Sequence, residues 1–328
     1  MINSETPSPF CKKTVRIGSV LAFAAIVLIA LFLARNADRS TWHEDTGKIF
    51  GTAYHIKYMG KYDVHNLISL ELEKVDNTFS IFNPQSLVSR INAGQTDSVN
   101  SLFREVFLMC EEVHGATLGA FDPTVRPAVE AWGFGKAAPP AIPPEKIDSL
   151  RQLIGLRKVS LEGSVLRRPH GVTLDFGAIA KGYAVDRVAR ILEKTGVRRY
   201  IVEIGGEVRA LGLNPQGDPW QVGIVSPPSD GGILATDMQD EMLQITQGSV
   251  ATSGNYNNIR HIGGKRYSHT IDPVTASPHL SDILSATVIA PQCAVADAYA
   301  TAFMVMGRDK TLKFLSGKDT TQLKAILY

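Results

Sequence analysis

The stretch Thr173–Gly196, "TLDFGAIAKGYAVDRVARILEKTG", decides the fold of this 328-residue chain. Its apolar beginning predicts a buried strand over residues 172–176 that carries the carboxylate of Asp175. A glycine turn follows, and an apolar stripe at spacings of about 3.6 residues then predicts a helix that stops at Gly196. Lys181 lies in the first turn of that helix, where a lysine is otherwise mildly unfavourable.

The entry to this helix combines the features of an anion site. A helix N-terminus offers free N–H groups and the positive end of a dipole, and Lys181 adds a full positive charge there. Asp175 places a negative charge close by, so a phosphate together with a metal ion is one interpretation. The alternative is a tight strand–helix turn on which Lys181 is simply solvated. The stretch matches neither the Walker A loop nor the dinucleotide-binding glycine motif.

The composition narrows the class of protein. The chain is 44% hydrophobic and 20% charged, which suits one large globular domain or two fused lobes. Its formal net charge of +2 gives no electrostatic reason to expect nucleic acid as a partner. The three cysteines, Cys11, Cys110 and Cys293, are far apart and in no metal spacing, so a disulfide framework is not indicated.

The N-terminal region has the pattern of a membrane anchor. Residues 17–34 contain no charge and no proline, and about 20 such residues span a bilayer. Basic residues before this segment favour a cytoplasmic tail over residues 1–16 and an exported remainder. We therefore predict a single-pass signal anchor over residues 17–34, a linker over residues 35–48 and an exported folded domain over residues 49–328. The alternative is a cleaved signal peptide, which Arg35 disfavours.

The body predicts an α+β fold with mainly antiparallel sheets and flanking helices, because its strands cluster in hairpin-like pairs without regular βαβ alternation. Besides the helix after residue 180, helices are expected over residues 67–79, 102–116 and 294–306. Strands are expected over residues 52–58, 158–161, 165–167, 172–176, 200–204, 220–224, 242–245, 266–271 and 285–289.

The stretch "AVADAYATAFMVMG" over residues 294–307 carries a second set of polar groups. Asp297 and Thr301 are four residues apart and therefore share one face of the predicted helix. Their oxygens suit Mg²⁺, which usually shares its protein ligands with a phosphate. Alternatively, Asp297 caps the helix and Thr301 bonds to the carbonyl of the preceding turn. Small apolar neighbours surround Asp297, and a carboxylate in such surroundings needs a partner.

Three further stretches carry weaker signals. "SHTIDPVTASP" over residues 268–278 places His269 at the end of a strand, where its imidazole is either structural or a general base. "GAFDPTVRP" over residues 119–127 contains Phe121, which is either a core residue or one wall of a slot for a flat ring. "EIGGEVRALG" over residues 203–212 contains a glycine pair that permits close backbone approach.

Taken together and in this order, these stretches resemble the ApbE family of flavin transferases. The matching segments run from "GTAYHI" at Gly51 through "FSIFNPQSLVSRIN", "LDFGAIAKGYAVD" and "SVATSGNY" to "ADAYATAFMVMG", and they cover nearly the whole exported body. The resemblance implies a Mg²⁺-dependent enzyme that binds FAD, transfers FMN through its phosphate to a threonine or serine hydroxyl of a partner protein and releases AMP. It also implies partners among the subunits of membrane redox complexes, and therefore an anchor in the bacterial cytoplasmic (inner) membrane with the body on the periplasmic side. The implied fold is α+β with antiparallel sheets in paired subdomains.

The resemblance further implies roles for individual residues. His269 takes the place of the catalytic base. The residues implied to contact FAD are Phe50, Phe82, Ala120, Phe121, Asp122, Asp175, Lys181 and Ile271. The implied metal ligands are Asp297, Thr301 and the main-chain oxygen of Ala178.

The chain departs from the family pattern at two of these positions. Phe50 stands where the family often has methionine, and Phe82 stands where it often has tyrosine. A phenylalanine at position 82 keeps the aromatic face but lacks the hydroxyl, so one hydrogen bond to FAD is expected to be missing. This change is expected to alter either the affinity for FAD or the balance between transfer and hydrolysis.

Two other functions remain open on the sequence. An FAD pyrophosphatase would use the same site with water as the acceptor, and it would release free FMN. A non-enzymatic, membrane-tethered flavin-binding module would keep the FAD slot and dispense with the base and the metal. The combined presence of His269, Asp297 and Thr301 favours an enzyme.

Overall fold

The structure, a computed structural model, describes residues 26–27, 40–134, 142–225, 240–255, 259–262, 265–279 and 281–328. The segment Trp42–Tyr328 forms one compact unit. Apart from residues 26–27, the predicted membrane anchor over residues 17–34 lies outside the described residues. None of the helices that are described is long and apolar enough to cross a membrane.

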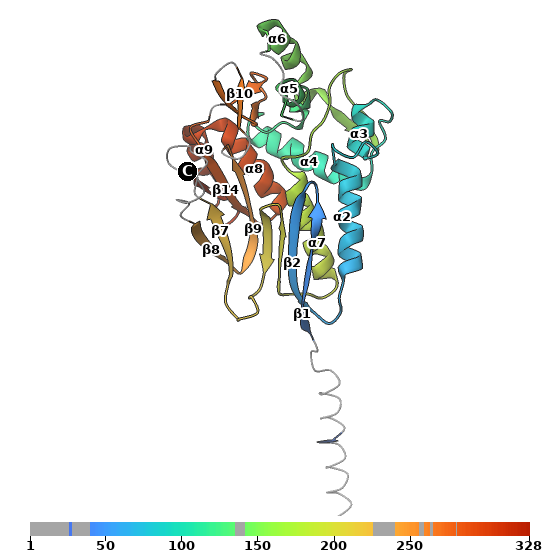
Figure 1. Cartoon of the computed structure of the whole chain (residues 1–328), viewed down its shortest axis with the longest axis vertical. Helices are drawn as coiled ribbons and strands as arrows, with labels where there is room; N and C mark the ends of the chain where they lie inside the picture. Colours follow the sequence, from blue (N-terminus) through green and yellow to red (C-terminus); the bar gives the residue numbers. More distant parts are fainter. Residues whose placement is uncertain are drawn as a thin grey trace, which may run out of the picture. The chain divides into compact units, whose positions relative to one another are not determined.

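Within the described residues, a seven-stranded sheet forms the centre of the body (Figure 1). In spatial order its strands are β1 (Thr41–Ile49), β2 (Thr52–Gly60), β5 (Tyr200–Ile204), β6 (Glu207–Leu211), β9 (Gln247–Gly254), β14 (Ser285–Ala290) and β15 (Lys324–Leu327). From β2 to β15 every neighbouring pair is antiparallel. The remaining strands form antiparallel pairs: β3 (Ser160–Glu162) with β4 (Val165–Arg167), β7 (Trp220–Val225) with β8 (Asp240–Ile245), β10 (Ile259–Ile262) with β11 (Lys265–Ser268), and β12 (Ile271–Asp272) with β13 (Ser277–Pro278).

The helices are arranged in layers on the sheet. They are α2 (His65–Phe79), α3 (Leu87–Asn92), α4 (Ser101–Ala116), α5 (Arg126–Ala131), α6 (Pro144–Leu153), α7 (Ala180–Lys194), α8 (Cys293–Met306) and α9 (Arg308–Leu315), with short 3₁₀ helices at Pro123–Val125 and Leu156–Lys158. Helix α7 packs on β5 and β6, and α8 packs on β9 and β14. Helices α2 and α4 in turn pack against α7 and α8. Helix α8 therefore lies between the sheet and another helix, which explains why it is apolar on nearly all sides.

Helices α7 and α8 approach each other unusually closely. A Cβ atom added at Gly182 of α7 would overlap the main-chain carbonyl of Cys293, so only glycine fits there. One turn further along α7, the Asp186 carboxylate accepts hydrogen bonds from the N–H groups of Cys293 at 3.0 Å and Ala294 at 2.9 Å. Asp186 thus caps the start of α8 from a different helix. Arg209 on β6 pairs with the same carboxylate at 2.7 Å.

At one end of the sheet, β9 extends beyond the end of its neighbour β6, which leaves a step in the sheet edge. Strands β5 and β6 meet at the turn Gly205–Gly206, where both glycines have positive φ angles of 61° and 99°. Val208 of β6 pairs with Val250 of β9, and β9 then continues beyond this turn to Gly254. The step places the start of β6 beside α7 and α8, and the charged residues described below gather there.

The structure confirms the α+β class, the antiparallel sheet and the flanking helices, but it corrects three expectations about individual segments. Residues 172–176 are not a strand, because their main chain pairs with loop and side-chain groups instead of a neighbouring strand. The strand expected over residues 266–271 is broken after Ser268. Thr41–Ile49 forms β1, so the second part of the predicted linker over residues 35–48 belongs to the sheet.

The expected division into paired subdomains also differs from the structure, in which Trp42–Tyr328 is one compact unit. It contains one large hydrophobic core around the sheet and helices α2, α4, α7 and α8. A second, smaller cluster holds Trp132, Ile271 and their apolar neighbours from α5 and α6. The chain thus buries its apolar residues in two unequal clusters within a single unit.

The close contact between α7 and α8 yields a stability prediction. Gly182→Ala should lower the free energy of unfolding by about 1–3 kcal/mol, because the added methyl group must displace the Cys293 carbonyl. Urea unfolding followed by circular dichroism measures the change. The matched control is Gly115→Ala on α4, where an added Cβ meets no atom within 4 Å and the variant should be as stable as the parent or slightly more stable. Equal stability of the two variants would contradict the packing described here.

Candidate functional site

A buried cluster of charged side chains lies where α7, α8 and β6 meet. The Lys181 ammonium group pairs with the Glu207 carboxylate, whose side chain is only 2% exposed. Asp297 on α8 is 3% exposed. Burial opposes the charge on Lys181, but the negative charges of Asp297 and Glu207 outweigh it and raise the pKa of Lys181 to about 12. Lys181 is therefore a permanent cation at neutral pH.

The single positive charge of Lys181 does not offset the cost of burying the Glu207 and Asp297 carboxylates, so the pKa values of both stay raised. Burial, together with the charge of Asp297, raises the pKa of Glu207 to about 8 even though Lys181 lies beside it. Among the described residues, the second carboxylate oxygen of Glu207 is buried with no hydrogen-bond partner. Burial also raises the pKa of Asp297. One cation against two buried carboxylates makes this a place where a further positive charge would be stabilised.

Asp297 changes the way in which α7 begins. Its Oδ2 atom accepts a hydrogen bond of 3.1 Å from the N–H group of Gly182. In a regular helix, this N–H would point to the carbonyl four residues earlier, that of Ala178. In the described part of the chain, the Ala178 carbonyl accepts no hydrogen bond. A free main-chain oxygen thus lies at the helix entry, where the Asp297 carboxylate also arrives.

Thr301 lies one turn beyond Asp297 on α8. Its Oγ1 atom is 3.1 Å from the hydroxyl of Ser253 on β9. Asp297 is not the cap of α8, because that position belongs to Gln292, which makes no side-chain capping bond. The structure therefore differs from the alternative interpretation, in which Asp297 caps the helix and Thr301 bonds to the carbonyl of the preceding turn.

His269 follows β11 directly and is exposed to solvent. Although the residue is exposed, nearby protein atoms remove part of the water around its imidazole, and this desolvation lowers the pKa of His269. The positive charge of Lys181 lowers the pKa further. The imidazole is thus within electrostatic reach of the buried cluster. A neutral imidazole at neutral pH can accept a proton from a hydroxyl group.

The turn before α7 is held by main-chain and aromatic contacts. The N–H of Asp175 donates to the carbonyl of Pro123 at 2.7 Å, and Asp175 Oδ1 accepts from the N–H of Gly177 at 2.8 Å. The fully buried ring of Phe176 lies 5.2 Å from the ring of Phe79. The hydrogen bond from Asp175 to Pro123 joins the turn before α7 to residues 120–122, and both stretches were predicted to contact FAD.

Asp122 is buried, and its carboxylate is already engaged. Oδ1 accepts from the N–H of Thr124 at 2.8 Å and from the Thr124 hydroxyl at 2.5 Å, and Oδ2 accepts from the N–H of Leu156 at 2.9 Å. The carboxylate therefore holds this loop in shape. The contact of Asp122 with FAD remains a prediction. Because the carboxylate is engaged, we expect the main chain of Asp122 to make this contact.

The other predicted FAD contacts differ in how accessible they are. Phe121 is buried in the large core and Ile271 in the smaller cluster, so neither presents its full side chain to a ligand. Ala120 is half-buried, and so is Phe50 in the turn between β1 and β2. Phe82 is 75% exposed, which leaves its ring free to meet a ligand.

Sequence reasoning missed Glu207, Asp186 and Ser253. Glu207 follows the Gly205–Gly206 turn directly, and a carboxylate at the start of an apolar strand was the available signal. Asp186 lies three residues after Tyr183 on the buried side of α7, where an acidic residue requires a partner. Ser253 carries no such signal, because its partner Thr301 is 48 residues away.

The donors at the site fit a small divalent cation. The described residues contain no group of three or more histidine, cysteine or acidic side chains that could hold a metal. The predicted set is of another kind, because it combines one carboxylate, one hydroxyl and a main-chain carbonyl. All three are the oxygen ligands that Mg²⁺ prefers, and so small a set leaves the remaining positions to phosphate and water. Two observations support this fit: the Ala178 carbonyl accepts no hydrogen bond from the described residues, and the pKa values of two neighbouring buried carboxylates are raised, so that a cation can replace their protons.

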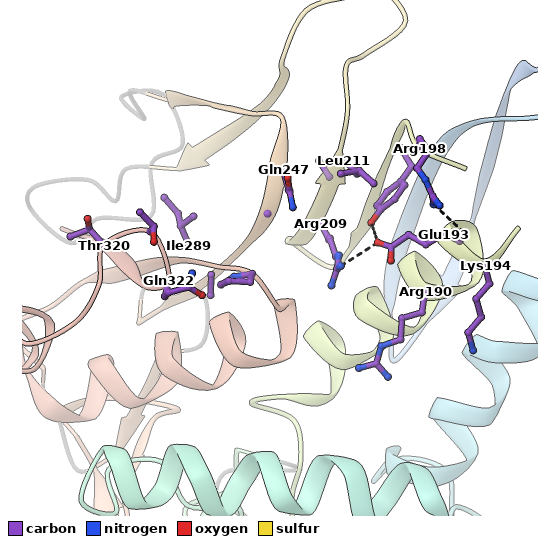
Figure 2. A pocket seen from close by; sticks show the side chains of 16 residues that line it. Arg190, Glu193, Lys194, Arg198, Arg209, Leu211, Gln247, Ile289, Thr320 and Gln322 are labelled. Carbon is purple, nitrogen blue, oxygen red and sulfur yellow. Dashed lines mark hydrogen bonds and ion pairs between the residues drawn. The ribbon is translucent and has the colours of Figure 1, made fainter. Parts of the chain in front are cut away.

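A large cavity of about 940 Å³ lies elsewhere, at the C-terminal half of α7 (Figure 2). Two of its arginines are paired with carboxylates: Arg190 with Glu105 at 2.5 Å, and Arg209 with Asp186 at 2.7 Å and Glu193 at 3.2 Å. Arg198, which also lines the cavity, donates to the main-chain carbonyls of Glu193 and Val197. None of the predicted site residues lines this cavity.

The comparisons with known proteins concern the chain as a whole. The profile of the ApbE family matches residues 50–327. An FAD:protein FMN transferase of Vibrio cholerae is 35% identical over 277 residues, which cover 81% of each chain. One of Haemophilus influenzae is 33% identical over 307 residues, which cover 88% of this chain and 87% of the relative.

Solved structures give the same result. The flavin transferase ApbE from Vibrio cholerae aligns with a TM-score of 0.76 at 33% identity, covering 88% of this chain and 97% of that structure. The apo flavinyl transferase ApbE of Pseudomonas stutzeri aligns with a TM-score of 0.76 at 30% identity, covering 88% and 95%. These flavin transferases share both the fold and most of the length of this chain. The chain belongs to the ApbE family, which confirms the predicted resemblance.

The electrostatic link between Lys181 and His269 can be measured directly. Lys181→Gln should raise the pKa of His269 towards its ordinary value, because the variant removes a positive charge that disfavours the imidazolium ion. An NMR pH titration of the histidine ring protons measures this shift, with His269→Gln to assign the signal. The matched control is Lys146→Gln on α6, an exposed lysine outside the cluster. An unchanged pKa of His269 in Lys181→Gln would show that the two groups are not coupled.

Proposed function

We propose that this chain is a Mg²⁺-dependent FAD:protein FMN transferase, which moves FMN from FAD to a threonine or serine hydroxyl of an acceptor protein and releases AMP. The observation that carries the proposal is the buried cluster of Lys181, Glu207 and Asp297 beside the free Ala178 carbonyl. The relatives with which the chain shares most of its length are named FAD:protein FMN transferases. Both the cluster and the family point to phosphoryl chemistry on FAD.

The pyrophosphate of FAD would bind at the start of α7. The permanent charge of Lys181 and the N–H groups of the helix entry suit its oxygens. Asp297, Thr301 and the Ala178 carbonyl would hold Mg²⁺, which neutralises charge on the phosphate oxygens during phosphoryl transfer. Because the pKa of Lys181 is about 12, this residue acts as a fixed charge and not as a proton donor.

His269 would activate the acceptor. Its neutral imidazole takes the proton of the acceptor hydroxyl while the hydroxyl oxygen forms a bond to the phosphorus on the FMN side. The P–O bond to the AMP phosphate breaks, and AMP leaves with the bonding electron pair. A positioned base of this kind contributes roughly 10²–10⁴-fold to the rate.

Hydrolysis of FAD to FMN and AMP is the second candidate, and Phe82 is the observation that favours it. Its exposed ring lacks the hydroxyl that the family often has at this position. If that hydroxyl helps to place FAD relative to the acceptor, its loss shifts the balance from protein towards water.

The location and partner of the enzyme are also part of the proposal. We infer that residues 17–34 anchor the chain in the bacterial inner membrane and that the body lies on the periplasmic side, since the segment is uncharged and basic residues precede it. The acceptor is then a subunit of a membrane redox complex that is accessible from the same side. Protease treatment of spheroplasts tests the orientation: digestion of the body supports it, and full protection would contradict it.

The decisive assay uses the full chain in detergent with FAD, Mg²⁺ and a protein domain that carries an acceptor threonine. Mass spectrometry follows the acceptor while AMP is measured in parallel. A mass gain equal to FMN together with AMP release supports the transferase. AMP with free FMN and no labelled acceptor supports hydrolysis, and bound FAD without AMP supports a non-enzymatic flavin-binding module.

Asp297 provides a prediction for the metal-dependent step. Asp297→Asn should lower kcat by roughly 10²-fold or more and raise the Mg²⁺ concentration for half-maximal activity, because the variant removes a charged ligand. AMP release at increasing Mg²⁺ concentrations measures both effects. Asp148→Asn on the exposed face of α6 is the matched control and should behave as the parent. Parental activity of Asp297→Asn would argue against the proposed metal set.

Phe82 provides a prediction for FAD affinity. Phe82→Tyr should lower the dissociation constant for FAD by about threefold to tenfold, because a new hydrogen bond contributes about 0.5–1.5 kcal/mol. Quenching of flavin fluorescence measures this constant. An unchanged constant and an unchanged ratio of transfer to hydrolysis would separate Phe82 from the flavin site.

A further inference from the structure

The segment before α7 is held by a side chain instead of a neighbouring strand. The side-chain amide of Asn92 donates from Nδ2 to the carbonyl of Leu174 at 2.8 Å, and its Oδ1 accepts from the N–H of Leu174 at 2.8 Å. Asn92 is the last residue of α3 and lies 82 residues away in the sequence. One amide thus satisfies both main-chain groups of Leu174, as a paired strand would do.

A second side chain reinforces this link between the segment and α3. The Arg168 guanidinium donates to the carbonyl of Val172 at 2.6 Å and also to the carbonyl of Ile91. The side chain of Leu174 is fully buried in the large core. Polar and apolar contacts therefore fix the same few residues.

This link determines where the FAD-facing turn begins. With both polar groups of Leu174 bound to Asn92, the N–H of the next residue, Asp175, is left to donate to Pro123. Gly177 and the entry to α7 follow, and Lys181 lies in its first turn. A displacement of Leu174 would therefore move Asp175 and the helix entry together.

Helix α3 also reaches towards the other predicted wall of the site. Its N-cap, Ser86, accepts from the N–H of Ser89 at 3.1 Å and donates to the carbonyl of Ser80 at 2.7 Å. Phe82 lies in the loop that these contacts close. The N-terminal end of α3 thus holds the loop of Phe82. The C-terminal end holds the turn of Asp175 through Asn92.

We propose that Asn92 is a positioning residue of the FAD site, which acts through Leu174 to place Asp175 and the entry of α7 for binding of the FAD pyrophosphate. It touches none of the reacting groups. The inference rests on the proposed function for the identity of the substrate. If Asn92 served only stability, its replacement would lower the melting temperature and leave FAD binding by the folded molecules unchanged.

The first test is Asn92→Asp in the full chain. At neutral pH the new carboxylate still accepts from the N–H of Leu174, but it cannot donate to the Leu174 carbonyl and repels it. We expect KM for FAD to rise about tenfold, with a smaller change in kcat, well below the melting temperature. At lower pH the protonated carboxyl regains an O–H donor. The activity of the variant relative to the parent at the same pH should therefore rise as the pH falls from about 8 to about 5.5.

The matched control makes the same chemical change in another loop. Asn214 accepts from the N–H groups of Gln216 and Asp218, both at 3.0 Å, and its Nδ2 donates to the carbonyl of Pro219 at 3.3 Å. Asn214→Asp therefore also removes one amide donor from a bound loop, between β6 and β7. It should leave KM for FAD unchanged at every pH.

Two outcomes would overturn the proposal: an unchanged KM in Asn92→Asp, or a raised KM whose ratio to the parent does not respond to pH. If Asn92→Asp fails to fold, Asn92→Ser replaces it, and it should show the raised KM without recovery at low pH. Equilibrium binding of FAD, measured by flavin fluorescence, separates this inference from the proposed function. A parent chain that binds FAD and releases no AMP would end the transferase proposal, and the binding constants would still decide the role of Asn92.

Discussion

The close approach of α7 and α8 is the constraint on which the site depends. Because Gly182 has no side chain, the main chains of the two helices meet, and the Asp297 carboxylate reaches the N–H of Gly182. Asp186 fixes the same contact from the other side by capping α8. Two helices that begin more than 100 residues apart in the sequence are thereby locked in one register. A wider spacing would separate Asp297 from Lys181.

This register accounts for the electrostatics of the site. Lys181 comes from α7, Asp297 from α8 and Glu207 from the start of β6. The two carboxylates are buried and raise the pKa of the half-buried Lys181, and the charge of Lys181 opposes the rise in the pKa of both carboxylates. The two buried carboxylates with raised pKa values, and an Ala178 carbonyl without a hydrogen-bond donor among the described residues, make the cluster suitable for a cation. The adjoining helix entry suits a phosphate, so the same few residues can serve both partners of a phosphoryl transfer.

The sequence predicted the regular elements better than the contacts between them. Helix α7 was predictable because its apolar stripe has a clear period, and α8 because it is continuously apolar. Residues 172–176 have the apolar pattern of a buried strand, but their main chain binds Asn92 and Pro123, and such distant partners leave no mark in the local pattern. The predicted site residues Lys181 and Asp297 come within electrostatic reach of each other through an equally long-range arrangement, which the family resemblance implied and local periodicity could not.

The central claim is that the contact between α7 and α8 builds a cation site beside the phosphate-binding helix entry. The most direct measurement is the anomalous diffraction of Mn²⁺, used in place of Mg²⁺, in crystals of the protein with FAD. The account predicts an anomalous peak in contact with the Asp297 carboxylate, the Thr301 hydroxyl and the Ala178 carbonyl. A peak at residues remote from these three, or bound FAD without any peak, would contradict it.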